Sequence, residues 1–327
     1  MNGWLGVNLF FVLSGFLLTQ QLLRAVELQP LIGAAIQFWR RRAYRILPCY
    51  LIVLFVLWIA PSITLGLGAL DAEQLAAHLL FLQDYFASDF FIPSWSLATE
   101  EKFYLLLPFG AFLLKRLSRR TAGVIFIGLS LMVLAERTII LSPPSPIDYS
   151  LFFWRVRAPF HLAVDGLLLG MAVGVFFDRK NIIIQPIYHL YLLFFSCSII
   201  VALLMATDWL TYSFLASSTI IWMFSGLTAI AIYSGCSLEF HKKIKSRLII
   251  SSFFAKISYP LYLVHFSFVY FSLNISRDLL KADSIWLSPA FWTIYLGSAV
   301  AAAYLLHVVV EAPLLKLRDS VTRTNIC

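Results

Sequence analysis

Charged residues are scarce in this sequence. Aspartate, glutamate, lysine and arginine together make up only 13% of its 327 residues, whereas a soluble domain carries about a quarter. Hydrophobic residues reach 61%, and the mean hydropathy is +0.85. A chain with so little charge cannot cover an apolar interior with a water-facing surface, so the composition excludes an ordinary soluble protein and predicts a polytopic membrane protein.

Cysteine is also scarce, with four residues in the whole chain. Their spacing matches neither a metal site nor a redox motif, so we expect them to be packing residues; they are Cys49, Cys197, Cys236 and Cys327. Internal repeats, low-complexity tracts and a separate soluble domain are missing from the sequence as well. It therefore predicts one membrane domain without a bound metal.

Acidic residues are fewer than basic residues, and the net charge is +8. Nucleic-acid binding proteins carry such charge along one face, but here the basic residues form short clusters between apolar stretches. We therefore expect no nucleic-acid partner, and interpret the clusters as signals that orient membrane helices.

Apolar stretches recur at the length that a membrane helix requires. A hydrocarbon core of about 30 Å is crossed by about 20 helical residues. The sequence predicts an all-α helical bundle of about nine transmembrane helices, over 4–23, 46–66, 95–114, 122–141, 159–177, 187–206, 212–235, 251–274 and 289–310.

Lysine and arginine are concentrated in every second connection between these helices. Eighteen lie in one set of connections and five in the other, so the first set is predicted to be cytoplasmic. The C-terminus then lies inside and Met1 outside, in a multi-pass protein of the cell membrane. On the outer side, we expect 71–93 to be an interfacial or re-entrant segment and Leu141–Pro146 to be a turn.

Two arginines of the basic run Trp39–Pro48 can serve either to bind phosphate or to orient the helix against anionic lipid. Arg42 and Arg45 are three residues apart and so share one side of a helix. Paired guanidinium groups can hold phosphate oxygens in bidentate fashion. For their neighbours Arg40 and Arg41, we favour a role in orienting the helix against anionic lipid.

Glu100 and Glu101 lie inside the third predicted span. Carboxylates at that depth require partners or a water-filled cavity. The sequence therefore predicts that Glu100 and Glu101 border a cavity near the outer leaflet. The bundle is also predicted to enclose a polar cavity that is lined by Arg42, Arg45 and Glu100, with the two arginines at the cytoplasmic end of the second span. The alternative for Glu100 is a buried ion pair with Lys102 or with an arginine of another helix.

Five stretches, in this order, resemble the motifs of acyltransferase family 3, whose members are integral membrane acyltransferases. They are GVNLFFVLSGFLLT at 6–19 against GVDxFFVxSGFLIT, RAYRILP at 42–48 against RxxRxxP, WSLATEEKFYLLLP at 95–108 against WSLxxEEQFYLLLP, ISYPLYLVH at 257–265 against ISYSLYLWH, and VEAPLLKL at 310–317 against VERPFLRL. The resemblance spans most of the chain.

The resemblance implies a membrane acyltransferase domain over 1–315 and a short cytoplasmic tail over 316–327. It also implies the transfer of an acyl group, most simply acetyl, from cytoplasmic acyl-coenzyme A to a hydroxyl of a glycan or glycolipid. The coenzyme would be a donor substrate rather than a permanently bound cofactor. The expected partners are membrane lipid and the acceptor.

Residue roles follow from the same resemblance. Arg42 and Arg45 would bind the coenzyme, Glu100 would hydrogen-bond the catalytic assembly or the acceptor sugar, and Trp95 and Ser96 would line the substrate cavity. Asn8, also expected there, stands where the family usually has aspartate.

His161 and Asp165 are four residues apart and so would share a helical face. We expect them to form a hydrogen-bonded intramembrane pair with Arg157, and Asp165 to line the cavity. HLAVDG, 161–166, also matches the HxxxDG pattern of soluble coenzyme A acyltransferases. This makes His161 the first choice for a replacement base, ahead of His265.

Ser14 lies in the LSGF part of the first motif. It lacks the GxSxG elbow that surrounds a catalytic serine in hydrolases. We therefore expect Ser14 and Gly15 to allow close packing of helices.

The family's members usually begin with another helix, which ends in the catalytic histidine and precedes the first motif. This sequence begins after that helix, which favours a misplaced start or a truncated sequence; an inactive family member is the alternative. A transporter or exporter is the rival from another class, but no inverted repeat is visible.

Overall fold

Helices make up every regular element of the described chain. The computed structural model describes residues 5–59, 71–88, 90–114, 116–141, 149–177, 185–205, 214–238, 249–280 and 288–324, and no strand occurs within these ranges. The all-α prediction is confirmed. The chain divides into two compact units, which are described separately below: unit 1 comprises 1–36, 84–87 and 95–242, and unit 2 comprises 37–83, 88–94 and 243–327.

Six described helical segments are long and apolar enough to cross a membrane. They are Gly6–Leu28, Leu31–Ile59, Arg119–Leu141, Pro186–Met205, Ser217–Ser237 and Pro289–Ser320. The membrane bundle is thereby confirmed, but the count of nine is not. The three other predicted spans coincide with α4 (Ser94–Leu114), which carries Glu100, Glu101 and Lys102, with the short α8 (Asp165–Phe176), and with α11 (Ile249–Leu280).

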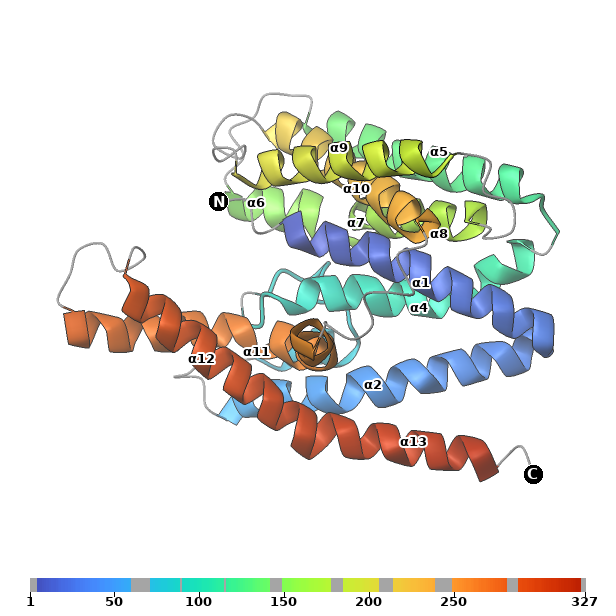
Figure 1. Ribbon diagram of the computed structural model, residues 1–327. Helices are drawn as coiled ribbons and strands as arrows, with labels where there is room; N and C mark the ends of the chain where they lie inside the picture. Colours follow the sequence, from blue (N-terminus) through green and yellow to red (C-terminus); the bar gives the residue numbers. More distant parts are fainter. Residues whose placement is uncertain are drawn as a thin grey trace. The chain divides into compact units, whose positions relative to one another are not determined.

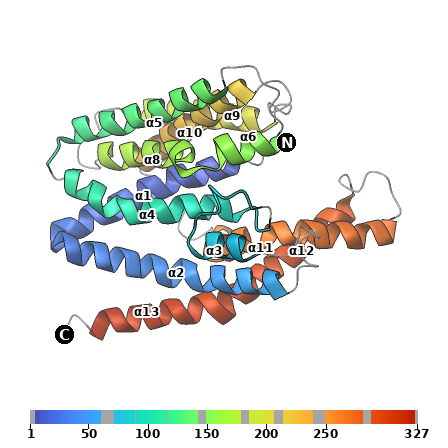
Figure 2. The same cartoon turned by 180° about the vertical axis from the view of Figure 1, so that it is seen from behind.

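Unit 1 is built around the packing of α1 (Gly6–Leu28) against α8, with α5 (Arg119–Leu141), α9 (Pro186–Met205) and α10 (Phe214–Ser237) beside them (Figure 1; Figure 2). A Cβ atom on Gly15 would collide with the Leu167 carbonyl oxygen, and one on Gly170 with the Val12 carbonyl oxygen. The glycines thus let the two backbones touch. The packing predicted for Gly15 is confirmed.

The fifth predicted span, 159–177, is not one continuous helix. It is preceded by α6 (Tyr149–Phe152) and the π-helical turn η3 (Phe153–Arg157), and consists of α7 (Phe160–Ala163) and α8. Pro159 lies before α7, and Val164 forms a turn between α7 and α8. His161 and Asp165 are therefore on different helices.

Unit 2 contains most of α2 (Leu31–Ile59), the short α3 (Ala72–Leu79), and α11 packed against α12 (Pro289–Leu306). α12 continues through the π-helical turn η7 (His307–Glu311) into α13 (Ala312–Thr324), as Figure 1 shows. Within this unit, the Tyr259 hydroxyl donates to the Ile46 carbonyl oxygen at 2.8 Å and ties α11 to α2.

α2 begins well before the second predicted span, 46–66. The helix begins at Leu31 rather than at residue 46, because residues 31–45 contain good helix formers and no proline. Arg42 and Arg45 consequently lie well inside the helix, roughly 16 and 21 Å from its first residue at 1.5 Å per residue.

Several sequence predictions concern residues outside the described ranges. They include most of the predicted turn at 141–146 and the basic residues at 179–180 and 242–247. The segment predicted to be interfacial does contain a described short helix, α3, whose N-terminus is capped by the Asp71 carboxylate accepting from the Gln74 amide at 2.7 Å.

Candidate functional site

Glu100 is the centre of a hydrogen-bonded cluster in unit 1. It lies on α4 and is buried. The Ser14 hydroxyl of α1 donates to its Oε1 at 3.0 Å, and the Tyr104 hydroxyl, one turn further along α4, donates to its Oε2 at 2.7 Å. The carboxylate is thus held in a fixed orientation by two hydroxyl groups. Lys102, one of the ion-pair partners considered from the sequence, forms a salt bridge with Asp84.

Asn8 and Trp95 meet at a second cluster of unit 1, around the buried guanidinium group of Arg157. Arg157 Nη2 donates to Asn8 Oδ1 at 2.6 Å, and Arg157 Cζ lies 5.3 Å from the centroid of the Trp95 ring. The Asn8 amide in turn donates to the Ser225 hydroxyl of α10 at 3.1 Å. The asparagine oxygen and the π face therefore both stabilise a buried positive charge. Ser96 is also buried.

Asp165 is paired with Arg137 rather than with His161. Asp165 Oδ2 and Arg137 Nη2 are 2.7 Å apart in a fully buried ion pair between α8 and α5. Arg137 Nε donates to the Leu162 carbonyl oxygen at 2.7 Å. The predicted group of His161, Asp165 and Arg157 was wrong, because the turn at Val164 separates the first two and Arg157 binds Asn8.

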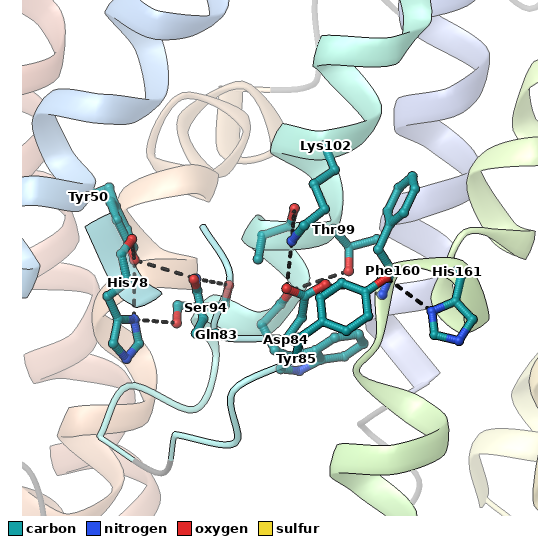
Figure 3. A network of polar contacts seen from close by, with 12 residues as sticks. Tyr50, His78, Gln83, Asp84, Tyr85, Ser94, Thr99, Lys102, Phe160 and His161 are labelled. Carbon is teal, nitrogen blue, oxygen red and sulfur yellow. Dashed lines mark hydrogen bonds and ion pairs between the residues drawn. The ribbon is translucent and has the colours of Figure 1, made fainter. Parts of the chain in front are cut away.

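His161 forms a third cluster of unit 1 with residues of the connection before α4 (Figure 3). The Tyr85 hydroxyl lies 3.0 Å from His161 Nδ1. The adjacent Asp84 carboxylate accepts from Lys102 Nζ at 2.6 Å and from the Phe160 amide at 3.1 Å. Burial raises the pKa of Asp84 above its ordinary value, although Lys102 and the Phe160 amide partly offset that effect.

Unit 2 holds a buried polar network around His78, at the end of α3 (Figure 3). His78 Nε2 lies 3.0 Å from the Ser88 hydroxyl, and Nδ1 lies 3.3 Å from the Tyr50 hydroxyl, which donates to the His78 carbonyl oxygen at 3.0 Å. Gln83 Nε2 donates to the Ser94 carbonyl oxygen at 2.9 Å. Burial lowers the pKa of His78 to about 4, so the ring is neutral at physiological pH.

The remaining predicted residues also lie in unit 2. Arg42 and Arg45 are on α2, and Arg42 Cζ lies 5.7 Å from the centroid of the Phe38 ring. Arg45 is exposed, and Arg42 is half-buried. His265 is on α11, with Nδ1 2.7 Å from the Tyr262 carbonyl oxygen. It is packed into its own helix.

Several members of these clusters were missed as site residues by the sequence reasoning, among them Tyr104, Ser14, His78 and Asp84. Tyr104 had a signal, since it is one helical turn from Glu100. Ser14 was interpreted only as a packing residue, although it binds Glu100 across 86 positions of the chain. His78 and Asp84 had no local signal, because their partners come from distant segments. Among the described residues, no three histidine, cysteine, aspartate or glutamate side chains converge on a possible metal position.

These features define a class: a multi-pass protein of the cell membrane whose helical interior holds buried glutamate, arginine and histidine clusters. The family is defined by comparison with known sequences. The family model described as an acyltransferase domain, that of acyltransferase family 3, matches residues 2–308. The chain belongs to this family, as its five motifs predict.

The relatives are named as O-acetyltransferases. "Putative O-acetyltransferase SACOL0978" of Staphylococcus aureus (strain COL) is 28% identical over 296 residues, which is 83% of this chain and 46% of that protein. The peptidoglycan O-acetyltransferase OatA of Listeria monocytogenes serovar 1/2a is 35% identical over 170 residues, 45% of this chain and 27% of that protein. The O-acetyltransferase OatA of S. aureus (strain NCTC 8325 / PS 47) is 26% identical over 295 residues, 83% of this chain and 46% of that protein.

The chain spans about half the length of the curated relatives that it matches, as the 46% coverage shows. No solved structure matches it.

Proposed function

We propose that the protein transfers an acyl group, most simply acetyl, from acyl-coenzyme A to a hydroxyl group of a glycan or glycolipid. The observation that carries this proposal is the Glu100 cluster, a buried carboxylate held by Ser14 and Tyr104 within the family's matched region. A buried carboxylate is costly in a membrane protein and is typical of a functional site. The names of the relatives support acetyl as the group and a glycan as the acceptor.

The donor is proposed to bind at α2, through Arg42 and Arg45. One is half-buried and the other exposed, so their guanidinium groups can reach the phosphate groups of a coenzyme in water. Charge-assisted, bidentate contacts with phosphate are the strongest that arginine makes. The basic connections of the chain support a cytoplasmic origin of the donor.

The chemistry is an acyl exchange between sulfur and oxygen. The thioester C–S bond breaks and a C–O bond forms to the acceptor oxygen; the acceptor proton goes to a base and then to the departing thiolate, which leaves as free coenzyme A. We propose His161 as that base, because its side chain is 48% exposed and hence accessible to an acceptor. Glu100 would orient the reacting groups, and Asn8, Trp95, Ser96 and Asp165 would shape the cavity.

The test measures transfer in membrane vesicles from cells that do or do not express the chain. Radiolabelled acetyl-coenzyme A is added, and alkali-labile label is counted on glycans and glycolipids. We expect label that depends on the chain and is lost in Glu100→Gln and His161→Ala. Equal label in both kinds of vesicle would contradict the proposal.

Donor binding is tested separately by the thermal shift that coenzyme A produces in the purified protein. Replacing both Arg42 and Arg45 by alanine should weaken coenzyme binding by at least about tenfold, since hydrogen bonds to charged groups contribute about 1.5–3 kcal/mol each. The matched control is Arg41→Ala, an exposed arginine of the same helix, which should retain the shift. If the thermal shift is retained in the double variant, the proposal that the donor binds at α2 is contradicted.

A further inference from the structure

Two exposed rings of unit 1 lie nearly parallel and next to each other (Figure 3). The Tyr85 and His161 rings are inclined by only 8°, with centroids 5.8 Å apart, and the Tyr85 hydroxyl lies 3.0 Å from His161 Nδ1. Figure 3 shows them side by side, joined at that contact. We call these two rings the Tyr85–His161 surface.

Buried contacts hold this surface in place. Asp84, next to Tyr85 in the chain, is fully buried and accepts from Lys102 Nζ and from the Phe160 amide, next to His161. The same Lys102 ammonium lies 5.4 Å from the centroid of the Tyr85 ring. One carboxylate therefore fixes both backbone segments that carry the rings, and a cation lies on one side of Tyr85.

The surface is exposed and bordered by a carboxylate. Tyr85 is 48% exposed, and the His161 and Glu136 side chains are 48% and 51% exposed. Glu136 Oε1, near the end of α5, lies 3.8 Å from His161 Nε2. A half-exposed carboxylate is costly to place against lipid, so this edge faces water or lipid headgroups. The charge pattern of the connections predicts that all three residues lie at the outer end of their segments.

We propose that the Tyr85–His161 surface binds an uncharged pyranose unit of the acceptor glycan, with Glu136 accepting hydrogen bonds from its hydroxyl groups. The C–H face of a pyranose is apolar and flat, and matches a rigid ring surface that is already ordered before binding. The carboxylate supplies strong acceptors for the hydroxyl groups at the edge of the sugar. The inference rests on the proposed function. It identifies the class of the acceptor and the residues that position the acceptor sugar next to the imidazole of His161.

The test measures sugar binding without any acyl donor. The chain in lipid nanodiscs is mixed in turn with chitotetraose, maltotetraose and mannotetraose, and saturation-transfer difference NMR follows the sugar C–H protons. We expect at least one of the three to bind, and Tyr85→Ala to weaken that binding by about fivefold, the loss expected for one aromatic contact. Tyr85→Phe keeps the ring and should retain most of the affinity.

Tyr191→Ala is the matched control, because Tyr191 is another exposed tyrosine of unit 1, at 62%, on α9; its removal should leave binding unchanged. If Tyr85→Ala does not fold, Glu136→Ala tests the same surface. Absence of binding by all three sugars, or equal loss in the control, overturns the inference.

The two proposals fail separately. Sugar binding that depends on Tyr85, without any acetyl transfer, would support the sugar site and contradict the proposed enzyme activity. Acetyl transfer with an acceptor KM that does not change in Tyr85→Ala would support the activity and overturn the sugar site.

Discussion

At the scale of single residues, buried polar groups of this protein are stabilised by a small number of well-oriented partners. Glu100 accepts from two hydroxyl groups, Arg157 donates to an amide oxygen, and His78 lies against hydroxyl groups. Phe81, just after α3, adopts a positive φ of 55°, which costs about 1–2 kcal/mol for a residue with a Cβ atom. Its ring stacks on Tyr50 at 4.9 Å, so packing offsets the strain and holds the chain beside His78.

The lowered pKa of His78 predicts how the stability of the folded protein depends on pH. Its folded pKa of about 4 lies below the ordinary value of 6.5, so between these two pH values the unfolded chain binds a proton that the folded protein does not. The contribution of the neutral ring is therefore complete above about pH 6.5 and is lost as the pH falls toward 4, by at most about 1.4 kcal/mol per pH unit. The unfolding temperature of the detergent-solubilised protein should fall from about pH 7 to about pH 5.

The variant His78→Gln should flatten this dependence, although it also lowers stability at neutral pH. Ala76→Gln is the control, because it adds the same side chain at an exposed position of α3 and removes no titratable group. An equally steep pH dependence in His78→Gln would show that other groups cause it.

At the scale of the elements, the ion pair of Arg137 and Asp165 joins α5 to α8. Both side chains are buried, with exposures of 2% and 0%, and Arg137 also reaches the carbonyl group of Leu162 in α7. One guanidinium group thus connects α5 with both halves of the broken helix. On its other side, α8 packs against α1 through the backbone contacts at Gly15 and Gly170.

Removing one partner of this pair should be much more harmful than removing both. Arg137→Met leaves the Asp165 carboxylate buried without its cation, which costs about 3–5 kcal/mol. The double variant Arg137→Met with Asp165→Leu removes both charges and should regain most of the lost unfolding temperature. If the double variant unfolds at a temperature no higher than that of Arg137→Met, the ion pair is not the main contribution of these two residues.

At the scale of the whole molecule, the number of membrane crossings depends on α4, α8 and α11. The six helices that meet length and hydropathy criteria do not include these three. Nine crossings require α4 to span the membrane although it carries Glu100, Glu101 and Lys102. Their partners lower the cost: Glu100 is bound by hydroxyl groups, and Lys102 is paired with Asp84.

A reporter fusion distinguishes these possibilities. If α4 crosses, a reporter at Ser118 lies in the cytoplasm, as does one at Gln29 between α1 and α2, whereas a reporter at residue 145 lies outside. Paired phosphatase and fluorescent-protein fusions measure the side directly. A reporter at Ser118 that is active outside would show that α4 does not cross and would contradict the prediction of nine.

The sequence by itself determined the class and the family, because hydropathy and motif order are local properties of the chain. Stretches of about 20 apolar residues predict helices without knowledge of their neighbours, and the all-α bundle and the acyltransferase family are both confirmed. The close packing at Gly15 was also predictable, since small residues in a membrane helix indicate backbone contact.

The tertiary structure alone decided which polar residues meet. Spacing placed His161 with Asp165, but the turn at Val164 puts Asp165 against Arg137 and His161 against Tyr85. Ser14 reaches Glu100, and Asn8 reaches Arg157, across 86 and 149 positions of the chain. A buried polar group is stabilised by the partner that helix packing brings within hydrogen-bond distance, about 3 Å. That partner often comes from a distant segment, so the spacing of residues along one segment does not predict it.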